Sequence, residues 1–114
     1  MINLRRGDVA RVIFPNSDLK TVKRRPALVL QRDGLRSGLP QTIVAMTSSN
    51  LARRGHASRV FVSVASEEAG GLRLDSVIMT DNLATAFDNE FNSLLRRLPD
   101  MAAIDLALKY TSAL

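Results

Sequence analysis

The chain has 114 residues, 46% of them hydrophobic and 24% charged, which is the composition of a globular domain and excludes a disordered protein. It contains no cysteine, which excludes disulfides and thiolate metal sites, and no apolar run is long enough to cross a membrane. We therefore expect one domain over residues 1–114, no signal peptide in residues 1–6, and a cytoplasmic location.

The net charge of +5 is divided unevenly along the chain. Residues 1–60 contain twelve Lys or Arg and three acidic residues, giving +9, whereas residues 61–114 contain four basic and eight acidic residues, giving −4. Thirteen of the sixteen basic residues are Arg, whose planar fork of donors suits bidentate contact with phosphate. The basic half therefore favours a nucleic-acid partner slightly over a solvated surface without a partner.

Short apolar or alternating segments, separated by turn residues, predict five strands. They are expected over residues 9–14, 27–30, 43–46, 59–64 and 76–79. Polar loops are expected over residues 15–25 and 33–41, and a turn over residues 69–71. We expect the fifth strand to end at Thr80 and the two polar residues that follow it.

The periodicity changes after residue 87. Apolar residues at 91, 94, 95 and 98 repeat with the spacing of one helix face, and Asp88 can cap the start, so this segment is predicted to be a helix. Pro99 separates it from a last helix, capped by Asp100 and running through Ala113. The last helix has two apolar faces, formed by Met101, Ile104 and Leu108, and by Leu106, Tyr110 and Ala113.

Two apolar faces on one helix exceed what a small core requires. The second face indicates self-association, although a fully packed helix would explain it equally well. Short strands followed by helices predict an α+β fold, in which a small curled barrel covered by helices leaves few strand edges exposed.

Two junctions in the basic half place reactive side chains at strand ends. Arg25 and Pro26 directly precede the apolar run 27–30, and Thr47 and Ser48 directly follow the apolar run 43–46. Arg keeps its charge and offers a fork of donors to a phosphate, and hydroxyl groups add further donors. We therefore expect the two strand ends to form one site.

Four segments occur in the order and spacing of one known family. They are Arg6-Gly7-Asp8-Val9, Arg25-Pro26-Ala27-Leu28-Val29-Leu30, Val44-Ala45-Met46-Thr47-Ser48, and Asp75-Ser76-Val77-Ile78 followed by Asp81. Each segment alone is weak, but the ordered set is specific, and over nearly its whole length the sequence resembles the MazF/PemK family of toxin endoribonucleases. The resemblance implies the MazF/PemK/CcdB-like toxin fold, a small SH3-like β-barrel of short strands with a C-terminal helix.

The resemblance also implies an activity and partners. Members are mRNA interferases, the toxins of type II toxin–antitoxin pairs, and they cut single-stranded RNA at short motifs without a metal or another cofactor. The ribose 2′-OH attacks its own phosphate, which leaves a 2′,3′-cyclic phosphate and a 5′-OH. The implied partners are the RNA, an acidic and partly disordered antitoxin, with which the toxin forms a DNA-binding complex, and a second copy in a homodimer. No membrane partner is implied.

Such a reaction needs a base for the 2′-OH, positive donors for the phosphorane oxygens, and an acid for the leaving oxygen. The resemblance makes Arg25 the stabilising cation, Thr47 the hydroxyl that orients the phosphate, and Asp81 the base found in some members. Some members carry Arg at the position of Met79, so Asp81 is the less secure assignment. The residues expected to bind RNA are Lys20, Lys23, Arg24, Ser48, Arg53 and Arg54.

Other interpretations remain open. A gyrase-directed, CcdB-like toxin would use the same barrel without needing Arg25 and Thr47, and a catalytically degenerate barrel would bind RNA without cutting it. The only histidine, His56, lies in a polar loop next to Gly55 and is expected to be a solvated bystander. The spacing of acidic and histidine residues predicts no metal site.

Overall fold

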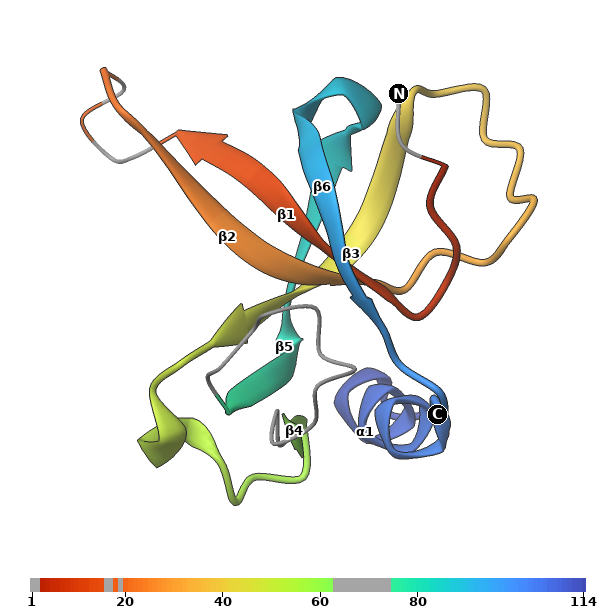
Figure 1. Cartoon of the computed structure of the whole chain (residues 1–114). Helices are drawn as coiled ribbons and strands as arrows, with labels where there is room; N and C mark the ends of the chain where they lie inside the picture. Colours follow the sequence, from red (N-terminus) through yellow and green to blue (C-terminus); the bar gives the residue numbers. More distant parts are fainter. Residues whose placement is uncertain (1–2, 16–17, 19, 63–74) are drawn as a thin grey trace.

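A computed structural model describes residues 3–15, 18, 20–62 and 75–114 of the chain (Figure 1). The described strands form one antiparallel sheet in the order β4-β5-β3-β2-β1-β6, which curls into a barrel-like shape with the helix α1 against it. The elements are β1 (Asp8–Pro15), β2 (Val22–Val29), β3 (Gln41–Ser48), η1 (Leu51–Arg53), β4 (Arg59–Val62), β5 (Ser76–Phe87), η3 (Asp88–Glu90), β6 (Phe91–Arg97) and α1 (Ala102–Ser112).

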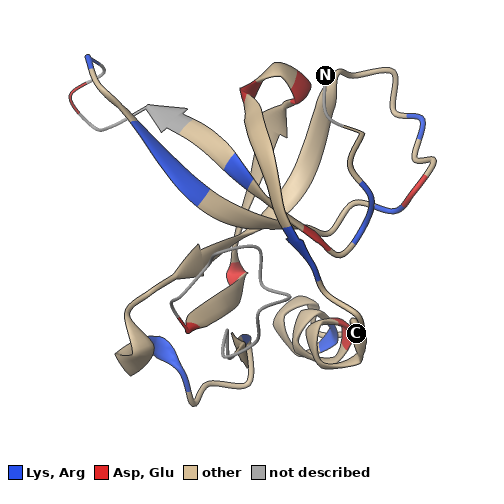
Figure 2. Ribbon diagram, viewed as in Figure 1, with Lys and Arg blue, Asp and Glu red and all other residues tan. Residues whose placement is uncertain are grey.

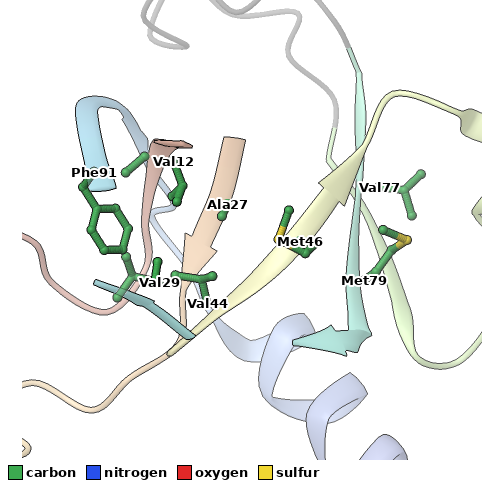
Figure 3. Close-up of a cluster of buried hydrophobic side chains, with 10 residues drawn as sticks. Val12, Ala27, Val29, Val44, Met46, Val77, Met79 and Phe91 are labelled. Carbon is green, nitrogen blue, oxygen red and sulfur yellow. The ribbon is translucent and has the colours of Figure 1, made fainter. Parts of the chain in front are cut away.

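The sheet separates two apolar clusters, because successive side chains of a strand point to opposite faces. The cluster on the inner face of the curled sheet includes Val12, Ala27, Met46, Met79 and Phe91 (Figure 3). The cluster on the outer face lies under α1 and consists of buried Val9, Leu28, Leu30, Ala45, Ile78 and Ile104. Each strand therefore has an inner side and a side facing α1, and this alternation decides where its polar residues lie.

Gly7 and Asp8 join three strands at the base of the barrel. Gly7 has a φ of 95°, and its backbone pairs with the carbonyl of Val29 and the amide of Leu98. The Asp8 carboxylate is fully buried and accepts hydrogen bonds from the Arg5 amide (2.8 Å) and from Nε of Arg97 (2.6 Å). The Arg-Gly-Asp segment near the N-terminus therefore has a structural role.

The last helix was confirmed, although it begins at Ala102, with Met101 at the N-cap position, and ends at Ser112 instead of Ala113. The carboxylate of Asp100 accepts the amide of Ala102 at 2.9 Å, and Ile104 and Ala107 are buried against the sheet. The second apolar face is open in the monomer, with Leu106 71% exposed and Tyr110 61% exposed. Among the described residues, no helix is long and apolar enough to span a membrane.

The helix predicted around residues 91–98 was wrong: this segment is the edge strand β6, paired with β1. Its register shifts twice against β1, between Val9 and Ala10 and between Arg11 and Val12. Each shift adds a residue to the strand, so its apolar residues recur at intervals of three and four and imitate a helix. Leu94 is 46% exposed, so the predicted helix face is not a buried face.

Two strand boundaries were also wrong. β5 does not end at Thr80 but continues to Phe87, and β2 begins at Val22, inside the segment predicted to be a loop. The strands over residues 9–14, 27–30, 43–46 and 59–62 were confirmed. The predicted turn over residues 69–71 and the end of the strand predicted over 59–64 lie outside the described residues.

Candidate functional site

Arg25 lies on a part of β2 that has one neighbouring strand. β2 pairs with β1 from Val22 to Leu28 but with β3 only from Ala27 to Val29, so no described strand covers its β3-side edge at Arg25, which we call the open edge of β2. The side chain is exposed, and it has no hydrogen bond or ion pair with any residue that the structure describes. An arginine in this position keeps all its donors available to a ligand.

Thr47 lies where β3 separates from β2. Its hydroxyl donates a hydrogen bond of 2.9 Å to the carbonyl of Pro26, the residue after Arg25. Ala27 pairs with Met46, so continuing the register places Pro26 beside Thr47 and Arg25 beside Ser48. The structure thus brings the two predicted strand ends together.

The Arg25 and Thr47 side chains nevertheless leave their strands on different faces. By alternation, Arg25 shares the inner side with Ala27, whereas Thr47 shares the α1 side with Ala45. Ser48 lies on the Arg25 side, and its hydroxyl accepts the amide of Asn50 at 3.1 Å. A phosphate bound by both Arg25 and Thr47 would therefore have to lie over the open edge of β2.

A small hollow of about 20 Å³ opens on the α1 side of this junction. Pro26, Thr47 and Arg96 are among the residues that line it, together with apolar residues such as Val9 and Leu98. A larger cleft of about 440 Å³ lies at the opposite end of β2, around Arg5, Arg6, Gln31, Arg32 and Thr42. None of the predicted site residues lines this cleft, and its Arg6 is already bound to Asp105 and to the Leu30 carbonyl.

Asp81 lies in a different part of the sheet. Residues 80–82 form a bulge in β5, because Met46 pairs with Met79 while Ala45 pairs with Leu83. The Asp81 carboxylate accepts a hydrogen bond of 3.0 Å from Arg59, and this bond is the main reason why the pKa of Asp81 lies below its usual value. The pairing of β3 with β5 runs from Met46–Met79, next to the bulge, to Ser48–Val77, next to Arg25. Asp81 and Arg25 therefore lie on opposite sides of Thr47, and the structure does not join Asp81 to the Arg25 site.

The predicted RNA-binding arginines and lysines fall into two groups. Arg53 and Arg54 are exposed near η1, where Arg53 donates to Sδ of Met79 at 3.6 Å and the Arg54 guanidinium lies 5.7 Å from the ring centroid of Phe61. The second group lies in the β1–β2 hairpin and is also exposed: Lys20, Lys23 and Arg24.

Two arginines that the sequence did not identify lie near the site. Arg96 lines the hollow with Thr47, and Arg11 lies opposite Pro26 on β1 (Figure 2 shows basic segments on β1, β2 and β6). Arg11 interrupts the apolar run of the first strand, and such an isolated cation within a strand is the signal that could have identified it. Among the described residues, no group of three His, Cys, Asp or Glu side chains could hold a metal ion.

Comparisons with known proteins define the class of this curled sheet and helix. A family model described as "PemK-like, MazF-like toxin of type II toxin-antitoxin system" matches residues 5–110. The chain belongs to this family, which confirms the resemblance found in the sequence. Among curated proteins, none matches the chain.

Solved structures show the same fold. An endoribonuclease in complex with its cognate antitoxin, from a mycobacterial species, has a TM-score of 0.74 at 20% identity and covers 98% of this chain and 97% of its own. The Mycobacterium tuberculosis toxin MazF-mt6 has a TM-score of 0.70 at 25% identity, covering 92% and 97%. MazF from Deinococcus radiodurans has a TM-score of 0.72 at 18% identity, covering 100% of both chains. The predicted α+β toxin fold is confirmed.

Proposed function

We propose that this chain is a sequence-selective endoribonuclease that cuts single-stranded RNA without a metal, as the toxin of a type II toxin–antitoxin pair. One observation carries the proposal: Arg25 is exposed and unpaired among the described residues, at an open strand edge held beside β3 by the Thr47–Pro26 hydrogen bond. Family membership and the endoribonuclease named among the similar structures support it.

In the proposed reaction, the 2′-oxygen of a ribose attacks the adjacent phosphorus. A P–O2′ bond forms, the P–O5′ bond breaks, a base takes the proton of the 2′-OH, and the 5′-oxygen receives a proton. Arg25 would stabilise the charge that develops on the phosphorane oxygens, because its fork can bind two of them. Ser48 lies on the same side of the sheet and would act as a second donor.

Thr47 would act from the other side of the strand edge. Its hydroxyl proton is engaged by the Pro26 carbonyl, so its first contribution is to hold the backbone next to Arg25. The resemblance implies Asp81 as the base, but the Arg59 ion pair lowers its pKa and makes it a weaker proton acceptor. The cleavage rate of Asp81→Asn tests this assignment.

The experiment that tests this function uses purified protein and a long single-stranded RNA in excess EDTA. We expect cleavage, with a 5′ fragment that ends in a cyclic phosphate. Arg25→Ala, purified in the same way, controls for contaminating ribonuclease. Loss of activity on chelation, restored by a divalent cation, would overturn the metal-independent mechanism.

We also propose a homodimer and an acidic antitoxin as partners. Leu106 and Tyr110 are exposed on α1, and burying them against a second copy would remove apolar surface from water. The charge of +9 over residues 1–60 complements an acidic, partly disordered antitoxin. Light scattering at micromolar concentration tests the dimer: we expect twice the monomer mass, and Leu106→Glu should halve it.

A further inference from the structure

Three arginines form a diagonal row across neighbouring strands on the α1 side of the sheet. Arg24 on β2 pairs with Ile13 of β1, and Arg96 on β6 pairs with Val9 of β1, so each lies diagonally across from Arg11. Diagonal neighbours of this kind are about 7–8 Å apart. We call Arg24, Arg11 and Arg96 the arginine row.

The three side chains share one face. Val9 belongs to the cluster under α1, whereas Ala10 and Val12 belong to the inner cluster, so alternation places Arg11 on the Val9 side. Arg96 lines the hollow that Val9 also lines. The unshifted β1–β2 register places Arg24 on the same side as Arg11.

No member of the row has an acidic partner among the described residues, whereas Arg6, Arg59 and Arg97 each have one. Arg11 and Arg96 are half-buried, so their charges are screened less than those of fully exposed side chains. Like charges on adjacent strands repel one another. Such a row lowers the stability of the free protein and becomes favourable when an anion covers it.

The row also leads to the candidate site. Arg96 and Thr47 line the same hollow, and Arg11 lies opposite Pro26. The row consists of two diagonal steps of about 7–8 Å each, so it extends over roughly 15 Å, which suits a chain of phosphates better than one small anion.

We propose that the arginine row binds the phosphate backbone of the RNA strand and positions it at the Thr47 end of the site. The identity of that strand rests on the function proposed above. Arg11 and Arg96 are positioning residues in this proposal, because neither is placed against the reacting atoms. A purely structural alternative is that their aliphatic stems cover the apolar sheet.

The test compares two double variants that remove the same charge. Arg11→Gln/Arg96→Gln removes two members of the row and keeps most of each stem, while Arg32→Gln/Arg36→Gln removes two exposed arginines from the loop between β2 and β3. The probe is a single-stranded RNA with 2′-O-methyl groups, which cannot be cleaved, and its affinity is measured at several salt concentrations. Melting temperature and the KM and kcat for an ordinary RNA are measured beside it.

For the row variant we expect the slope of log affinity against log salt to fall by about 1.4, since each lost contact with a single strand removes about 0.7. The loop variant should change the slope by less than about 0.3 on the same scale. The KM for RNA should rise more than kcat falls. The melting temperature should not drop, because like-charge repulsion is relieved and the stems remain.

The other outcomes distinguish failure of the arginine-row proposal from failure of the proposed nuclease function. If the wild type cuts RNA and the two double variants bind it alike, the row is overturned and the nuclease stands. If the wild type binds RNA with a row-dependent slope but never cuts it, the nuclease is overturned and the row stands. A lower melting temperature with an unchanged slope would show that the stems only pack, and a loss confined to binding of a poly-glutamate peptide would show that the row serves a protein; either result overturns the proposal.

Discussion

Arginines at two kinds of place in this sheet have opposite surroundings. At the β1–β6 base and the β4–β5 bulge, Arg97 binds buried Asp8 and Arg59 binds Asp81. At the open edge of β2, Arg25 has no partner among the described residues. The difference indicates which charges stabilise the fold and which are available to a ligand, although all three residues are arginines within or at the end of a strand.

The largest effect on stability is expected for the Arg97–Asp8 ion pair at the base of the barrel. Arg97→Ala leaves the fully buried carboxylate of Asp8 with only the Arg5 amide, and a buried charge without its partner is costly. We expect the free energy of unfolding in urea titrations to fall more than for any other substitution proposed here, because Asp8 is fully buried although the Arg97 side chain is 53% exposed. Arg97→Lys keeps the charge and should lose less. An unchanged free energy of unfolding for Arg97→Ala would mean that the carboxylate is not effectively buried.

Arg25→Ala should greatly slow cleavage while hardly changing stability. The cleavage rate should fall at least about a hundredfold, as for removal of one transition-state donor, because the main charge on the phosphorane is lost. Stability should change by less than about 0.5 kcal/mol, since an exposed side chain at the end of a strand contributes little to the core. Arg25→Lys should restore little activity, because an ammonium lacks the fork. Cleavage at the wild-type rate by Arg25→Ala would show that the site is elsewhere.

Neutralising the hairpin charges should weaken binding rather than chemistry. A variant with Gln at Lys20, Lys23 and Arg24 should lower the salt slope of RNA affinity by about 2.1, or roughly fiftyfold in affinity at 0.15 M salt. It should also slow association with an acidic antitoxin, because electrostatic steering weakens. The measurement is RNA binding at several salt concentrations, with Arg32→Gln/Arg36→Gln as the control. An unchanged slope would mean that the hairpin is only a solvated surface.

Thr47 tests whether holding Pro26 matters for the reaction. Thr47→Val keeps the volume but removes the hydrogen bond to Pro26, which should cost about 1 kcal/mol of stability. We expect the rate to fall roughly tenfold, less than for Arg25→Ala, because the main cation remains. Thr47→Ser restores the hydroxyl and should recover most of the activity. Equal rates for Thr47→Val and the wild type would remove Thr47 from the site.

The strands of the first half were predictable because they are largely apolar runs bounded by turn residues, although β2 begins earlier than predicted. In the second half, α1 was predicted, but the end of β5 and all of β6 were not. In β5, the buried inward residue Ala86 is small and Leu83 is 48% exposed, so the strand lacks the large apolar alternation that identifies one. In β6, the register shifts against β1 produced a helical spacing in an edge strand.

The candidate site, too, was only partly predictable from the sequence. The proximity of Arg25 and the Thr47 strand end was predictable, because both lie at apolar-to-polar junctions of consecutive strands. The Arg59–Asp81 pair was not, because it depends on a bulge whose length sets the register of β5. The arginine row depends on the pairing of β6 with β1, and the sequence pattern had predicted a helix in place of β6.

The smallest effect is expected at Asp81, and its pH dependence distinguishes a structural pair from a catalytic base. Asp81 and Arg59 are partly exposed, so Asp81→Asn should cost only about 0.5 kcal/mol of stability at pH 7. The folded-state pKa of Asp81 lies below its ordinary value of 3.8, so the contribution is fully present above that value. It should disappear as the pH falls through the folded-state pKa, and the wild type and Asp81→Asn should then unfold at the same urea concentration.

Cleavage by the same variant completes the test of Asp81. Loss of a general base typically slows a reaction by about 10²–10⁴-fold, whereas loss of an exposed ion pair should slow it by less than about tenfold. We expect the smaller effect, because the Arg59 bond makes Asp81 a weak proton acceptor. Arg59→Gln is the matched variant, since it breaks the same pair and leaves the carboxylate in place. A large rate loss in Asp81→Asn but not in Arg59→Gln would identify Asp81 as the base and would extend the active site from β2 to the β5 bulge.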